Sequence, residues 1–198
     1  MDKIEICNMA LARIGVASIE TLNEPSEPAR KCLQFYEHDR RAVLRRFIWS
    51  WATRRVELAR VQTVPQDYEY AFRYPSDCVF LRKLYILEDG KLLPFPDFVE
   101  YKIFSDGEGK VLYTNYPNVV AEYTADVKDV ELMDELFIET LSWKLAASIA
   151  FKLTGNAQTA QMATQEYERM ILYASAEAEN EQNVRTSELD TFIKARFE

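Results

Sequence analysis

The sequence has few of the residues from which active sites are usually built. Its 198 residues include a single histidine, His38, and only five glycines, all of them at expected turns or helix ends. None of the common phosphate-binding or zinc-binding motifs occurs, so a glycine-rich phosphate loop has no place in this chain. We therefore expect no catalysis, no metal and no cofactor, while a catalytic site built on His38 stays open as an alternative.

Cysteine is also scarce, and its spacing argues against two kinds of small scaffold. Cys7, Cys32 and Cys78 lie far apart and form no Cys-x-x-Cys pair. That spacing argues against a zinc site and against a disulfide framework. Each cysteine is expected to be a small, buried, apolar residue in a reducing compartment.

Positive charge is in deficit overall, but the charges are unevenly distributed. The net charge is -8, which argues against nucleic-acid binding through bulk charge. Residues 30–60 nevertheless hold nine Lys/Arg and three Asp/Glu, whereas residues 126–198 hold seven Lys/Arg and fourteen Asp/Glu. Two readings stay open: two solvated helix faces, or opposite surfaces that attract one another between copies of the chain. For the second reading, the candidate subunit-interface residues are Arg40, Arg41, Arg45, Arg46, Asp134 and Glu135.

A third reading of the acidic residues is a divalent metal site. Asp129, Glu131, Asp134 and Glu135 cluster near an expected helix start. Acidic side chains are favourable at that position because they complement the helix dipole and cap free N–H groups. Capping explains the cluster more simply than a bound ion does.

The most distinctive stretch present is the apolar segment from Met133 to Gly155. Its apolar residues recur at helical spacing and cover nearly every side, so this helix is expected to be wrapped by other elements. Gly155 predicts its end. The segment is too short, and too closely flanked by acids, to predict a membrane span.

Three further helices are predicted around this one. The first spans residues 1–14, and the second runs from about Glu27 to about Arg54 with Ser26 as its N-cap. The third runs from about Ala157 to about Glu179 and follows such a short link that an antiparallel helical hairpin is expected.

Between the second and central helices, the sequence pattern changes to that of short strands. Asp89-Gly90 is a strong hairpin-turn signal between two such runs. Four aromatic residues alternate with other residues near the start of the region: Tyr68, Tyr70, Phe72 and Tyr74. They predict a strand whose aromatic face packs against the helices, or alternatively a stacking platform for bases or sugars.

The predicted fold class is α+β, mainly α: a helical bundle core with an inserted small antiparallel β lobe and an extended C-terminal tail. Residues 1–63 would supply the N-terminal helices of the bundle and residues 64–125 the β lobe. Residues 126–180 would form the C-terminal helical hairpin, and residues 181–198 a docking tail.

The predicted tail carries four large apolar residues beyond the core helices: Leu189, Phe192, Ile193 and Phe197. Burying one such side chain contributes about 1.5–3 kcal/mol, so leaving all four in water would waste that stabilisation. The tail either folds back on its own domain or inserts into a partner, and we favour insertion. In a ring of identical subunits, many weak insertions would act together.

Several short motifs, taken in order, resemble a known family. The motifs are Ala-Leu-Ala-Arg-Ile-Gly at 10–15, Phe-Ile-Trp-Ser-Trp-Ala at 47–52, Tyr-Pro-Ser-Asp-Cys at 74–78, Trp-Lys-Leu-Ala-Ala at 143–147 and Tyr-Glu-Arg-Met at 167–170. Their arrangement resembles the head-to-tail adaptor, or connector, proteins of short-tailed bacteriophages, the tail tubular protein A type. The resemblance covers nearly the whole chain. It transfers no site residue, because the family is not an enzyme family.

The resemblance implies a structural role in the virion. Such adaptors form a ring of twelve subunits between the portal protein and the tail nozzle protein, at the head–tail junction. They are assembled in the host bacterial cytoplasm, and DNA passes through their lumen without sequence-specific binding; no membrane is involved. The apolar tail would then dock in the portal. An alternative function is a nucleic-acid-binding module that uses Arg40, Arg41, Arg45 and Arg46.

Overall fold

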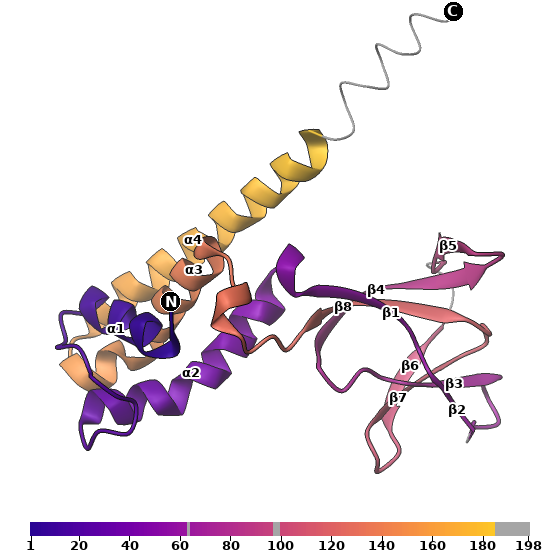
Figure 1. Ribbon diagram of the computed structural model, residues 1–198, viewed down its shortest axis with the longest axis horizontal. Helices are drawn as coiled ribbons and strands as arrows, with labels where there is room; N and C mark the ends of the chain where they lie inside the picture. Colours follow the sequence, from indigo (N-terminus) through magenta and orange to yellow (C-terminus); the bar gives the residue numbers. More distant parts are fainter. Residues whose placement is uncertain (63, 97–99, 185–198) are drawn as a thin grey trace, which may run out of the picture. The chain divides into compact units, whose positions relative to one another are not determined.

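The computed structural model describes residues 1–62, 64–96 and 100–184 and divides the chain into two compact units. One unit comprises Met1–Phe47 and the chain from Asp129 onward, and we call it the helical unit. The other, Ile48–Lys128, is the strand unit. Figure 1 shows the helices and the strands with their labels.

The first two helices of the helical unit begin at side-chain caps. Helix α1 (Lys3–Arg13) starts at a capping box, in which Asp2 accepts from the Glu5 N–H at 2.8 Å and Glu5 accepts from the Asp2 N–H at 2.6 Å. Helix α2 (Glu27–Arg46) starts at Ser26, as the sequence predicts. These caps satisfy N–H groups that have no partner within the helix.

Helices α3 (Glu135–Thr154) and α4 (Ala157–Val184) form the second half of the helical unit. Asp134 caps α3 by accepting from the Phe137 N–H at 2.6 Å, and Gly155 ends α3 with a φ of 65°. That left-handed conformation strains residues with a Cβ, so glycine suits the position. The central helix and its stop residue were therefore predicted correctly.

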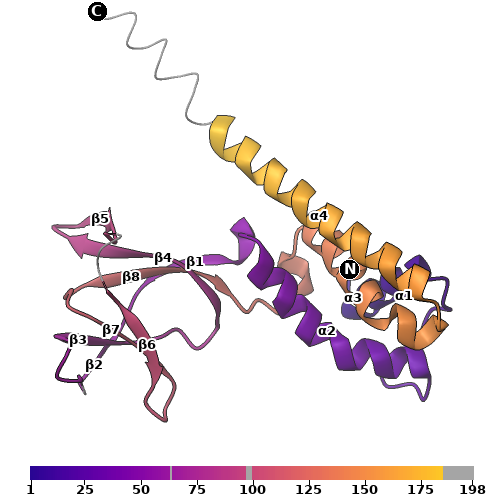
Figure 2. The same cartoon turned by 180° about the vertical axis from the view of Figure 1, so that it is seen from behind.

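Helix α4 packs along α3 and then continues past it, as Figures 1 and 2 both show. The side of α4 that packs is marked by four buried residues at helical spacing: Ala163, Tyr167, Ile171 and Ala174. At 1.5 Å per residue, α3 is about 30 Å long and α4 about 42 Å. The last two turns of α4 therefore project beyond the start of α3.

The strand unit contains two four-stranded antiparallel sheets. The first has the order β1 (Thr53–Glu57), β8 (Val119–Ala125), β4 (Cys78–Glu88), β5 (Lys91–Pro94). The second has the order β2 (Arg60–Val61), β3 (Tyr70–Arg73), β7 (Lys110–Thr114), β6 (Lys102–Ser105). Both sheets supply buried apolar side chains, among them Leu84 and Val119 from the first and Phe72 and Leu112 from the second.

The turn between β4 and β5 is the one that the sequence predicts. Asp89 and Gly90 both have positive φ, at 48° and 75°. Two successive residues of this kind match the twist of antiparallel strands, which is why Asp-Gly is favoured there. Strands β4 and β5 pair immediately on either side of this turn, with Glu88 opposite Lys91.

The predicted fold class is wrong. Strands make up 24% of the chain and helices 45%, and the strands build two complete sheets with their own buried core. The result is a mixed α/β fold in which the β region is too large to be a small lobe on a helical bundle core. Two short 3-10 turns, Ser50–Ala52 and Val130–Leu132, lie next to the boundaries of the strand unit.

One local error contributed to this mistake. The second helix ends at Arg46 rather than near Arg54, and Thr53–Glu57 form strand β1. β1 pairs with β8, where Thr53 lies opposite Thr124 and Glu57 opposite Val120. This pairing joins residues that are more than sixty positions apart, so it overrides the local helical pattern without leaving a signal nearby in the sequence.

Candidate interaction surfaces

The arginines predicted as one surface on α2 divide into buried and exposed residues. Arg40 is 1% exposed and its Nη2 atom lies 3.0 Å from Glu37 Oε2. Arg41, Arg45 and Arg46 are exposed. Arg40 continues the four-residue spacing of Cys32 and Tyr36, so its position on the inner side could have been read from the sequence. Arg40 is thus not part of the exposed basic surface.

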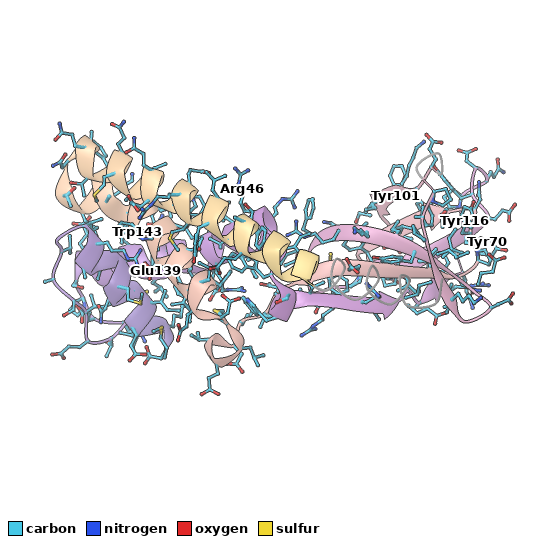
Figure 3. The ribbon with its side chains drawn as sticks, turned by 90° about the horizontal axis from the view of Figure 1, so that it is seen from above. Arg46, Tyr70, Tyr101, Tyr116, Glu139 and Trp143 are labelled. Carbon is cyan, nitrogen blue, oxygen red and sulfur yellow. The ribbon has the colours of Figure 1, made fainter. Side chains whose placement is uncertain are left out.

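Opposite charges of α2 and α4 meet within a single chain. Arg46 Nη2 lies 3.5 Å from Glu168 Oε2, and both side chains are more than half exposed. Figure 3 labels Arg46 on the helical unit. An exposed pair of this kind stabilises a protein by about 0.2–1 kcal/mol. Some of the basic charge of α2 is therefore paired with acidic charge of α4 within one subunit.

Arg13 makes a contact with α3 that the sequence did not predict. Its Nη2 atom lies 2.5 Å from Glu139 Oε1, and its guanidinium group stands 4.0 Å from the ring centroid of Trp143. Glu139 and Trp143 are one helical turn apart, and Figure 3 shows them on the same stretch of α3. The one-turn spacing of Glu139 and Trp143 can be seen in the sequence. Their contact with Arg13 cannot, because Arg13 lies 126 positions before Glu139.

Two members of the acidic cluster, Asp129 and Asp134, cap helices. Asp129 accepts from the Glu131 N–H at 3.0 Å, and Asp134 accepts from the first turn of α3. Over residues 1–62, 64–96 and 100–184, no group of three or more His, Cys, Asp or Glu side chains is placed to hold a metal ion. Glu135 is exposed.

One carboxylate is buried in the helical unit. Asp39 on α2 is 1% exposed, next to the exposed His38. Burial raises the pKa of Asp39 above its usual range, and a hydrogen bond from Ser148 together with the nearby Lys144 partly offsets that rise. Within the described part of the chain, the Oδ2 atom of Asp39 has no hydrogen-bond partner. We therefore expect the stability of the helical unit to depend on pH through Asp39.

The aromatic residues of the strand unit form small contacts rather than one continuous platform. Phe72 is buried, whereas Tyr68 and Tyr70 are half-buried. Tyr68 stacks on Tyr113 with ring centroids 5.8 Å apart, and Phe104 approaches Tyr113 from β6 at 5.7 Å. Of the four alternating aromatic residues, Phe72 is therefore part of the buried core, while Tyr68, Tyr70 and Tyr74 are half-buried.

A second aromatic group lies at one end of the strand unit. Phe95 contacts Tyr101 and Tyr116 edge to face, with centroid distances of 6.1 Å and 5.3 Å. Arg60 stands over the Tyr70 ring and its Nε donates to the Pro117 carbonyl at 3.1 Å. Figure 3 shows Tyr70, Tyr101 and Tyr116 at that end of the unit. The edge strands β5 and β6 nearby carry exposed apolar side chains, which are Leu92, Leu93, Ile103 and Phe104.

The helical unit also carries apolar side chains in solvent. Leu172 on α4 is 69% exposed, Tyr173 is 54% exposed, and Phe151 on α3 is 59% exposed. Leu172 and Tyr173 lie close to the point where α4 passes beyond α3. The predicted docking residues Leu189, Phe192, Ile193 and Phe197 lie outside the described residues.

No family model matches the sequence, and no curated protein matches it significantly. Among the helices that the structure describes, none is long and apolar enough to cross a membrane.

Proposed function

We propose that this protein is a structural adaptor subunit of a bacteriophage, which assembles into a ring between the portal and the tail nozzle and lets DNA pass. The proposal starts from the order of motifs along the chain, which resembles that of tail tubular protein A adaptors. In this role the protein holds other proteins together and performs no catalysis.

The structural observation that carries the proposal is the projection of α4. This helix continues about two turns past α3, and it carries the exposed Leu172 and Tyr173 near the start of the projection. We propose that a partner covers these two side chains. The projection leads into the segment with Phe192 and Ile193, which we propose as the portal-docking residues.

The charge of the chain is compatible with a DNA channel. At a net charge of -8, the subunit would not hold the phosphates of a passing genome strongly. A basic wall would instead bind DNA through counterion release and slow its passage. Exposed arginines on α2 and acidic residues such as Glu135 remain the candidates for contacts between neighbouring subunits.

The test is capture of the protein by a purified portal protein encoded in the same genome. The double variant Phe192→Ala, Ile193→Ala should lose most of its portal binding while circular dichroism shows an unchanged helix content. The matched control, Thr191→Ala with Lys194→Ala, changes polar neighbours in the same segment and should bind normally. Undiminished capture of the Phe192/Ile193 variant would contradict the docking role of the tail.

Electron microscopy of the mixed proteins tests the ring separately. Rings attached to the portal are expected for the unmodified chain. Subunits that stay free of the purified portal even when they are added in large excess would contradict the adaptor function as a whole.

The exposed arginines of α2 favour a second candidate function, nucleic-acid binding. Arg41 and Arg45 are one helical turn apart and both are exposed. If they bind phosphates, the isolated protein should retard DNA in a gel at low salt, and Arg41→Gln with Arg45→Gln should abolish that shift. The absence of a retarded band at low salt would remove this candidate.

A further inference from the structure

Two cysteines that are 25 positions apart in the sequence meet in the core of the helical unit. Cys7 lies on α1 and Cys32 on α2, and both are fully buried free thiols. The pKa of each thiol is shifted by the other, which fits two side chains that lie close together. The third cysteine, Cys78, belongs to the strand unit and is only partly buried.

The contacts on either side of the thiols fix how the two helices face each other. One turn before Cys7, the Lys3 Nζ atom lies 4.3 Å from the ring centroid of Tyr36 and 2.8 Å from Glu37 Oε1. Tyr36 in turn lies one turn after Cys32. Figure 1 shows that α1 and α2 run in opposite directions, so one turn forward on α1 and one turn back on α2 place the two thiols opposite each other.

We propose that Cys7 and Cys32 form a disulfide that crosslinks α1 to α2 when the protein meets a low-molecular-weight disulfide oxidant. The inference rests on the burial of both thiols and on the helix contact that places Cys7 opposite Cys32. It does not depend on the adaptor function.

The environment of the pair indicates which cysteine reacts first. The hydrogen bond from the Cys7 thiol lowers the pKa of Cys32 below its ordinary value, although burial opposes this effect. The same hydrogen bond, together with burial, raises the pKa of Cys7. Since the thiolate is the nucleophile in disulfide exchange, Cys32 attacks first.

The reaction then balances in two exchange steps. The Cys32 thiolate attacks one sulfur of the oxidant, forming a mixed disulfide and releasing one small thiolate, which takes up a proton. The Cys7 thiol loses its proton and attacks Cys32 in that mixed disulfide, which forms the Cys7–Cys32 bond and releases the second small thiolate. The two cysteines are oxidised, and the oxidant is reduced to two thiols.

The crosslink should change stability and should form slowly. It closes a loop that contains the segment between α1 and α2, which restricts the unfolded chain and raises the melting temperature. Because both thiols are fully buried, the oxidant reaches them only when α1 opens locally. Oxidation should therefore be slower than that of a free small thiol under the same conditions.

The test uses the full chain, folded and treated with excess oxidised glutathione, then digested with trypsin without reduction. Mass spectrometry should find the peptide 4–13 joined to the peptide 32–40, two hydrogens lighter than the sum of the two. The oxidised protein should melt at a higher temperature than the reduced protein. The Cys78→Ala variant should give the same joined peptide and the same rise in melting temperature.

The variants Cys7→Ala and Cys32→Ala provide the matched controls, since each removes one thiol and keeps a small apolar side chain. Both should lose the joined peptide and the oxidant-dependent rise in melting temperature. The proposal is overturned if the folded chain keeps both thiols reduced, or if each thiol ends as a separate mixed disulfide with glutathione. It is equally overturned if the joined peptide appears only after the chain is unfolded in urea.

Discussion

The helical unit and the strand unit are held together in different ways. In the helical unit, one nearly all-apolar helix, α3, is buried by its neighbours, and charged or reactive groups such as Asp39 and Cys32 are buried with it. Among the described residues of the strand unit, the fully buried groups are apolar side chains and a few hydroxyl residues, and no charged side chain is fully buried. The comparison teaches that titration of a buried carboxylate should affect the helical unit, where Asp39 lies.

Arginine–carboxylate pairs also differ between the two units. In the helical unit some connect different helices, as Arg13 on α1 does with Glu139 on α3, and others lie within one helix, as Arg40 and Glu37 do in α2. In the strand unit they join neighbouring strands or hold turns, as Arg73 does with Asp106 at 2.9 Å. The Arg73 guanidinium holds the pKa of Asp106 below its usual range.

The largest expected effect is a cavity in the helical unit. Phe137→Ala on α3 removes a side chain that is completely buried, so the free energy of unfolding should fall by about 3–5 kcal/mol. Urea denaturation followed by circular dichroism would measure the loss. Phe151→Ala, on the same helix but 59% exposed, should change the free energy by less than about 0.5 kcal/mol. Equal losses in the two variants would contradict the burial of α3.

The corresponding change in the strand unit tests whether its core is equally well packed. Leu112→Ala on β7 should lower the free energy of unfolding by about 2–5 kcal/mol, because Leu112 is completely buried. Leu92→Ala on the edge strand β5, where the side chain is 39% exposed, is the matched control. If Leu112→Ala costs less than about 1 kcal/mol, the strand unit collapses around cavities more easily than the helical unit does.

A smaller effect is expected from the buried carboxylate, and it depends on pH. The pKa of Asp39 is raised in the folded protein, so folding is favoured when Asp39 is protonated, and this stabilisation is lost as the pH rises through the folded-state pKa. Asp39→Asn should therefore stabilise the protein at pH 7 by about 1 kcal/mol, within the usual range of single substitutions. The gain should shrink in acid.

Melting curves at several pH values would measure this difference. Asp67→Asn, at an exposed loop position of the strand unit, is the control and should leave the pH dependence of stability unchanged. A variant at Asp39 that is less stable than the unmodified chain at every pH would show that the charge itself is needed for packing.

The smallest expected effect concerns the surface ion pair between α2 and α4. A double-mutant cycle with Arg46→Ala and Glu168→Ala should give a coupling energy of about 0.2–1 kcal/mol that decreases with added salt. Urea denaturation of the two single variants, the double variant and the unmodified chain would measure it. Absence of coupling at low salt would leave both residues available for contacts between subunits.

Local sequence signals predicted the elements that are determined by residues close together in the chain. The α3 helix is marked by its apolar spacing, by the Asp134 cap and by Gly155, and the structure has each of them in place. The Asp89-Gly90 turn is likewise encoded within a few residues. Strand β1 was missed because its partner β8 lies far along the chain, and local patterns carry no information about such pairing.

The candidate surfaces were harder to predict than the elements. Arg40 was predicted to be exposed because it is an arginine. Its four-residue spacing from the buried Tyr36 nevertheless places it on the inner side of α2. The contact of Arg13 with Glu139 and Trp143, and that of Cys7 with Cys32, depend on how separate helices meet. Sequence spacing within one helix does not determine which residue of another helix lies opposite.

The projecting helix α4 has a mechanical consequence. Tension applied at its far end runs along the axis of a continuous helix, Ala157–Val184, and reaches α3 as a shearing load. The interlocked row from Ala163 to Ala174 would carry that load in parallel, so the contacts would have to fail together instead of peeling apart one after another. A helix anchored in this way suits a subunit that bears a force along the helix axis.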